Sequence, residues 1–228
     1  MSYAQDGEDA IVAQYFRERG VACARLLDIG AFDGRYLSNS RLLIEAGWTG
    51  VLVEASLHAF RDLLHYYGGN EQLQLVHAAI GGICEPDGLI VWHEHSKPSP
   101  AGPRVASAAS TSVAAQARHM QRIDPQNGEE DWRRYWLPHV SVQRLLLALP
   151  PPFMFVSIDT EGTSIDVLEA MDLEAMGTRV VCVEHNEKSD SVPDPGLHNE
   201  WTRAVAHCGK YGLGQVLFDN GVNMICGA

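Results

Sequence analysis

Basic residues and long apolar runs are scarce in this chain. Lysine and arginine together number 17 against 29 aspartates and glutamates, which gives a formal net charge of −12 at pH 7. Such a surface repels phosphate backbones and anionic lipids, so we expect neither nucleic acid nor a membrane as a partner. No apolar run approaches the ~20 residues that a membrane span needs, and the first residues lack the basic and apolar pattern of a secretion signal. The sequence therefore predicts a cytoplasmic protein.

Three further absences narrow the class of protein. None of the five cysteines (Cys23, Cys84, Cys182, Cys208 and Cys226) forms a Cys-x-x-Cys pair, so neither a disulfide framework nor a zinc knuckle is expected. Cysteines within apolar runs are expected in the core instead. The chain has no internal repeat and no Gly-x-Gly-x-x-Gly motif, which argues against an NAD-linked oxidoreductase. Its 228 residues suffice for one α/β domain with a substantial core.

What the chain does contain is a glycine turn after a short apolar run, Leu26-Leu27-Asp28-Ile29-Gly30-Ala31-Phe32-Asp33-Gly34. A second apolar run ends at Glu54, about twenty residues later, as in a dinucleotide-binding unit. A strand, a glycine turn, a helix and a second strand that ends in an acid form a nucleoside site at the carboxyl edge of a parallel sheet. The glycines permit positive φ angles and close backbone approach, and the acid binds the ribose hydroxyls.

The spacing of the turn favours a nucleoside without phosphate. A dinucleotide places its pyrophosphate at a helix N-terminus, where the acid Asp28 would be unfavourable. S-adenosylmethionine carries no phosphate, and its methionine end has a sulfonium cation and a zwitterion. The residues that we expect to bind this cofactor are Gln5, Glu8, Asp28, Gly30, Ala31, Gly34, Ser38, Asn39, Glu54, Ala55, Ala79, Ile80 and Asp159.

Some of these assignments have equally plausible structural alternatives. Gln5 and Glu8 belong to a polar segment that could lie across the methionine end of the cofactor. Alternatively, the acids of this segment could stabilise the N-terminus of the helix that follows. Ala79 and Ile80 end the third expected strand, where adenine would lie or where they would only pack.

Alternating strand and helix patterns predict a single domain over residues 1–228 with a doubly wound, Rossmann-like, mostly parallel sheet. The expected strands cover about 25–29, 51–54, 73–80, 89–92, 153–158 and 179–184, and the expected helices about 11–19, 38–46, 57–67, 142–149, 165–171 and 201–209. Asn220-Gly221 predicts a closing antiparallel hairpin between 216–218 and 223–225.

Residues 93–139 interrupt this alternation with prolines, small residues and scattered histidines. A long irregular segment within a compact domain is commonly a binding loop, so we expect a substrate lid here. Helices are conceivable at about 113–121 and 129–136. The histidines lack the tight spacing of metal ligands.

Two later strands end in polar clusters, at Asp159 to Glu161 and at Glu184 to Asn186. These clusters meet at one sheet edge, so Asp159, Glu161, Glu184 and His185 are candidate catalytic residues. One hypothesis makes His185 or a carboxylate the general base. The other places a divalent cation such as Mg²⁺ on Asp159 with His185 or Asn186. Alternatively, Glu161 and Glu184 only cap helices or accept backbone N–H groups.

Taken together, these motifs resemble the FkbM family of S-adenosylmethionine-dependent methyltransferases. The matching stretches are Tyr3 to Asp9, Leu27 to Ala31, Ser38-Asn39, Gly47 to Glu54, Ser157 to Gly162 with Val167-Leu168, and Val183 to Asn186. The metal hypothesis resembles the catechol-type O-methyltransferases, which place an acid at the end of one strand and an Asp-Asn pair at the end of the next. Only Asp159 and Asn186 match this pattern, and Glu184-His185 departs from it. The FkbM resemblance implies a class I methyltransferase sheet.

The resemblance also implies methyl transfer to a hydroxyl of a small molecule, sugar or natural product. An amine or peptide nitrogen is the alternative acceptor, and a nucleoside-binding scaffold without catalysis is the alternative from another class. A homo-oligomer is compatible with the sequence.

Overall fold

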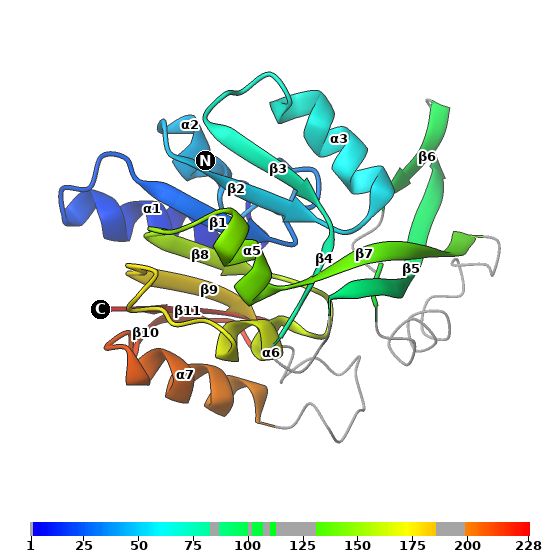
Figure 1. Ribbon diagram of the computed structural model, residues 1–228. Helices are drawn as coiled ribbons and strands as arrows, with labels where there is room; N and C mark the ends of the chain where they lie inside the picture. Colours follow the sequence, from blue (N-terminus) through cyan, green and yellow to red (C-terminus); the bar gives the residue numbers. More distant parts are fainter. Residues whose placement is uncertain (1, 83–86, 100–101, 107–109, 113–130, 186–198) are drawn as a thin grey trace.

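A seven-stranded mixed sheet forms the centre of the protein in the computed structural model, which describes residues 2–82, 87–99, 102–106, 110–112, 131–185 and 199–228 (Figure 1). Its strand order is β10-β11-β9-β8-β1-β2-β3. The strands are β1 (Arg25–Ile29), β2 (Thr49–Glu54), β3 (Leu73–His77), β8 (Phe155–Ile158), β9 (Val180–Glu184), β10 (Gln215–Asp219) and β11 (Asn223–Gly227). Neighbours from β3 to β9 are parallel, whereas β11 is antiparallel to both β9 and β10. The fold is compatible with a Rossmann-like fold.

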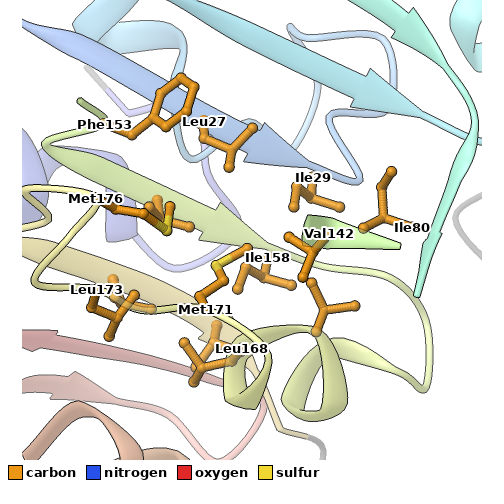
Figure 2. Packing of buried hydrophobic residues seen from close by; sticks show 14 of the residues in the cluster. Leu27, Ile29, Ile80, Val142, Phe153, Ile158, Leu168, Met171, Leu173 and Met176 are labelled. Atoms are coloured by element: carbon orange, nitrogen blue, oxygen red, sulfur yellow. The ribbon is translucent and has the colours of Figure 1, made fainter. Parts of the chain in front are cut away.

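Helices cover both faces of this sheet because successive side chains of a strand point to opposite faces. Leu26 packs in the core beneath α1 (Glu8–Glu18), α2 (Arg41–Glu45) and α3 (Leu57–Tyr67). The next residue, Leu27, packs on the other face with α5 (Val142–Ala148), α6 (Ser164–Glu169) and α7 (Glu200–Lys210). Figure 2 shows this second core, in which Leu27, Ile29, Val142 and Leu168 come together.

A smaller sheet has the strand order β4-β7-β5-β6. Its strands are β4 (Ala79–Gly81), β5 (Gly88–Ser99), β6 (Gly102–Ala106) and β7 (Trp132–Ser141). Figure 1 shows it beyond the carboxyl ends of β1 and β2, beside α3. The pairs β5–β7 and β5–β6 are antiparallel and β4–β7 is parallel.

The small sheet corrects two predictions. The strand expected over 73–80 is two strands in different sheets, because β2 ends at Glu54 opposite His77 and the chain beyond Ala78 pairs with β7 instead. The helix suggested at 129–136 is wrong: Trp132–Ser141 is a strand, in which Tyr135 and Leu137 oppose Trp92 and Ile90. Cross-strand pairs of aromatic and branched residues stabilise a sheet. The helix suggested at 113–121 lies outside the described residues.

Other predictions are confirmed. The expected strands at 25–29 and 51–54, the helix at 57–67 and the C-terminal hairpin all form, with the bounds given above. Cys182, Cys208 and Cys226 are buried, as their apolar surroundings predicted. None of the helices within the described ranges is long and apolar enough to cross a membrane.

Candidate functional site

A pocket opens at the carboxyl ends of β1, β2 and β8 and encloses about 900 Å³ of empty space, part of it open to solvent. The strand order reverses direction at β1. The chain continues from β1 to β2 and β3 on one side, and later strands, beginning with β8, add to the other side. Ligands of open α/β sheets bind at such switch points.

The glycine turn forms one wall, and Gly30 is the residue that the geometry requires. Its φ is +87°, and a Cβ there would lie 1.6 Å from the carbonyl oxygen of Asp159. The amides of Gly30 and Ala31 both donate to the carbonyl of Val53 at 2.9 Å. The turn therefore joins the ends of three strands around the pocket.

Gly34 has a different role from the one that we predicted. A Cβ added at this position would meet the ring of Tyr67 and a methyl group of Leu63. The carbonyl of Gly34 accepts a hydrogen bond from the Tyr67 hydroxyl at 2.9 Å. Gly34 is not among the residues that line the pocket. It allows the turn to pack against α3.

Asp28 lies buried at the base of the pocket, where it accepts the hydroxyl of Ser40. Burial raises the pKa of Asp28 to about 6, an effect that this hydrogen bond opposes only in part. Ser38 caps the amide of Arg41, and Asn39 reaches Ser157 on β8. The polar loop after the turn is therefore anchored to both strands.

Glu54 connects the end of β2 to the glycine turn. One carboxylate oxygen accepts the amide of Phe32 at 2.7 Å, and the other accepts the amide of Ser56 at 2.6 Å. Burial raises the pKa of Glu54 to about 7 despite these bonds. Each carboxylate oxygen has a second lone pair, so the group could still accept a ligand hydroxyl.

Three carboxylates meet at the ends of β8 and β9. Asp159, Glu161 and Glu184 each offer an oxygen within 4.8 Å of the others. Two effects raise the pKa of both Asp159 and Glu161 well above the usual range: burial is the larger, and repulsion from Glu184 is the second. The Oδ1 atom of Asp159 is buried and has no hydrogen-bond partner among the described residues. Three oxygen ligands at this spacing suit a hard divalent cation.

The backbone around the pocket is strained. Phe32, Leu37 and Glu161 line it and have φ angles of 52°, 56° and 54°. Non-glycine residues rarely adopt such angles, which cost of order 1–3 kcal/mol each and cluster at functional sites. The carbonyl of Glu161 accepts the hydroxyl of Thr111 at 2.8 Å, so the segment after β6 helps to hold this loop.

Most of the predicted site residues line this one pocket: Asp28, Gly30, Ala31, Ser38, Asn39, Glu54, Ala55, Ala79, Ile80, Asp159 and Glu161. Gln5 is exposed and Glu8 is buried, and neither lines the pocket. A carboxylate oxygen of Glu8 accepts the side-chain amide of Asn223, so Glu8 ties α1 to β11.

His185 is buried, and its Nε2 lies 3.2 Å from Asp219 of β10. Neither it nor Glu184 is among the residues that line the pocket. The structure brings Glu161 and Glu184 beside Asp159. The metal group of Asp159 with His185 stays a prediction. Asn186 lies outside the described residues.

Sequence reasoning missed several lining residues, among them Phe32, Tyr36, Leu37, Ser56, Trp92, Ser110, Ser112, Thr160 and Thr163. Ser56 carried a signal, because it is the N-cap of α3 and follows Glu54 closely. Trp92 ends a predicted strand, but only the small sheet places it at the pocket.

The charge of the pocket is one-sided. Asp28, Glu54, Asp159 and Glu161 all line it, whereas the lining residues in the described part of the chain include no lysine, arginine or histidine. This arrangement favours a cationic ligand and disfavours phosphates.

Comparisons with known proteins do not assign the chain to a family. No protein-family model matches the chain, and a search of curated proteins finds no match.

Proposed function

We propose that the chain is an S-adenosylmethionine-dependent methyltransferase of the kind that its motifs resemble, and that it O-methylates a small molecule, sugar or natural product. The observation that carries the proposal is the pocket at the glycine turn, lined by four carboxylates and, within the described residues, by no basic side chain. A sulfonium and an ammonium supply the positive charge that these acids lack.

The proposal assigns separate roles to the acids of the pocket. Glu54, fixed by two backbone amides, is placed to accept ribose hydroxyls. Asp28 and Asp159, at the ends of the adjacent strands β1 and β8, would face the cationic methionine end. S-adenosylmethionine supplies the methyl group and leaves as a neutral thioether. Binding both reactants in one orientation removes much of the entropic barrier.

The acceptor proton needs a base, and Glu161 is the best-placed candidate. A carboxylate with a raised pKa is a stronger base than an ordinary one, and burial raises the pKa of Glu161. His185 is less suited, because its Nε2 faces Asp219. Its role in the proposal is to support the end of β9 rather than to touch the acceptor.

A divalent cation is an alternative to a carboxylate base. Asp159, Glu161 and Glu184 would hold it, and their oxygen chemistry and the unpartnered Oδ1 of Asp159 fit a hard cation. Bound there, it would lower the pKa of an acceptor hydroxyl.

The same cluster supports a second candidate acceptor, a cationic amine. Three adjacent carboxylates would attract an ammonium group more strongly than a neutral hydroxyl. The N-methylation alternative rests on this observation.

The test is isothermal titration with S-adenosylhomocysteine. We expect the wild type to bind and Glu54→Ala to bind at least about tenfold more weakly, because a charge-assisted hydrogen bond contributes about 1.5–3 kcal/mol. Glu71→Ala is the control, since Glu71 is exposed and does not line the pocket. A wild type that binds NAD but not S-adenosylhomocysteine would refute the proposal.

Turnover separates an enzyme from a scaffold. Release of S-adenosylhomocysteine with hydroxyl or amine acceptors is expected for the wild type and not for Glu161→Gln. Tight cofactor binding without turnover on any acceptor would favour the scaffold.

A further inference from the structure

One wall of the pocket comes from the small sheet. Trp92 of β5 lines the pocket and is only 6% exposed. It forms an apolar cluster with Ala79 and Leu137, and Ala55 packs against this cluster. Ala55 and Ala79 follow the ends of β2 and β3, next to the ribose-binding candidate Glu54. A flat indole beside two small side chains offers a surface on which a base can stack.

The indole is held in place by Glu94, a fully buried acid. Its Oε2 accepts the indole N–H of Trp92 at 2.7 Å and the hydroxyl of Tyr135 at 3.0 Å. Its Oε1 accepts the hydroxyl of Ser56 at 2.7 Å and the amide of His58 at 3.3 Å. One carboxylate therefore joins β5, β7 and the start of α3.

The same hydrogen bonds continue to the glycine turn. Ser56 donates its amide to Glu54 and its hydroxyl to Glu94. Glu54 in turn accepts the amide of Phe32. The position of Trp92 is thus coupled through two carboxylates to the turn that forms the opposite part of the pocket.

We infer that the indole of Trp92 is the surface on which the nucleobase of the ligand stacks, and that Glu94 is a positioning residue that orients this indole relative to Glu54. The inference rests on the proposed function for the identity of the nucleoside. It deepens that function by assigning recognition of the base to the small sheet, outside the strands that carry the glycine turn and the acid cluster.

Position 94 requires a carboxylate rather than an amide. Each oxygen of Glu94 faces one donor that cannot reverse its role, the indole N–H of Trp92 on one side and the backbone N–H of His58 on the other. A glutamine presents one oxygen and one NH₂ group. In either orientation its NH₂ would face an N–H, although on the His58 side the ring Nδ1 of that residue also lies 2.9 Å from Oε1 and can accept in one of its tautomers. Glu94→Gln should therefore weaken the contact that orients Trp92 or the contact that fixes the start of α3.

The experiment measures binding of S-adenosylhomocysteine and of adenosine by titration calorimetry and by tryptophan emission. Trp92→Leu should bind both probes about tenfold more weakly, since stacking contributes about 1–3 kcal/mol per base. Trp92→Phe keeps a ring and should lose the emission change that the probes cause in the wild type. Trp136→Phe is the control, because Trp136 is 67% exposed on β7 and does not line the pocket.

Glu94 is tested by a double-mutant cycle. Glu94→Gln should weaken binding about tenfold in the wild type, since a buried unsatisfied donor costs about 1–3 kcal/mol. Its effect should be smaller in the Trp92→Phe background, because the conflicting indole N–H is then absent. A general loss of structure would instead give the same factor in both backgrounds.

The outcomes are separable. Binding of adenosine without S-adenosylhomocysteine would refute the methyl donor and leave this inference standing. An unchanged affinity in Trp92→Leu, or a persistent emission change in Trp92→Phe, would overturn the inference while the proposed function stands. A wild type that binds neither probe overturns both. Circular dichroism identifies any variant that fails to fold, and the emission change of the conservative Trp92→Phe then decides.

Discussion

Gly30→Ala is the substitution for which the structure makes the sharpest prediction. An alanine Cβ at this position would lie 1.6 Å from the carbonyl oxygen of Asp159 and 2.6 Å from its carbonyl carbon. Side chains essentially never approach closer than 3.0 Å, so the backbones of β1 and β8 must separate. The hydrogen bond from the amide of Asp159 to the carbonyl of Ile29, 2.8 Å long, lies at this point and would be lost or lengthened.

Two effects add to the cost. A residue with a Cβ at positive φ is destabilised by roughly 1–2 kcal/mol. The lost contacts between strands add about 1–3 kcal/mol for buried groups that lose their partners. We therefore expect Gly30→Ala to lower the free energy of unfolding by about 2–5 kcal/mol and to weaken binding of S-adenosylhomocysteine, because the displaced carbonyl belongs to a pocket residue.

Gly47→Ala is the matched control. Gly47 has φ +91°, close to that of Gly30, but a Cβ there would meet nothing within 4 Å. It should lose only the conformational term, roughly 1–2 kcal/mol, and keep its ligand affinity. Urea unfolding of both variants measures the difference. Equal losses of stability in the two variants would refute the role of Gly30 in closing β1 onto β8.

The remaining predictions concern charge. Asp159→Asn should raise the free energy of unfolding at alkaline pH, because it removes a carboxyl group whose ionised form is disfavoured by burial and by Glu184, and it should weaken binding of S-adenosylmethionine; a stability loss in urea unfolding would contradict this. The pKa of Glu54 is raised by burial to about 7, so the folded state keeps its proton to higher pH than the unfolded chain. The free energy of unfolding should therefore fall as pH rises from about 4.5 to 7, while affinity for S-adenosylmethionine rises because the ionised carboxylate accepts hydrogen bonds from the ribose hydroxyls more strongly. An affinity that titration calorimetry finds flat across this pH interval would speak against Glu54. If the acid cluster holds a metal, EDTA should abolish turnover and Mg²⁺ or Mn²⁺ should restore it; activity that EDTA leaves intact would favour a carboxylate base.

The sequence predicted the large sheet well because each of its strands carries a local signal. Leu26 and Leu27 form a fully buried run, which a turn with Gly30 then ends. Parallel strands buried on both faces produce such runs. The acids at the strand ends followed from the same rule, since the carboxyl ends of parallel strands share one edge.

The small sheet was harder to predict because its pairing is not local. Trp92 pairs with Tyr135 across a long intervening segment, so no short window of sequence shows that the two are neighbours. Their burial also depends on Glu94, whose partners come from α3, β5 and β7. A charged residue in a strand pattern looks solvent-exposed until its donors are known.

The distribution of charge in the fold bears on the choice of ligand. On the surface, several acids are paired with arginine: Glu45 with Arg41, and Asp166 and Glu169 with Arg203. The residues that line the pocket in the described part of the chain include four acids and no lysine, arginine or histidine, although buried charges are far costlier than exposed ones. Burial raises the pKa values of Asp28, Glu54, Asp159 and Glu161.

A ligand that brings positive charge would lower these pKa values again. It would offset part of the free energy that burial of the ionised carboxylates costs, and this gain appears as affinity. A pyrophosphate would do the opposite, since it would add negative charge to the same acids. The burial of these acids therefore supports the proposal of a sulfonium nucleoside over a dinucleotide. It predicts that S-adenosylmethionine stabilises the protein against heat more than the uncharged thioether S-adenosylhomocysteine does at equal saturation, and a larger stabilisation by the thioether would refute it.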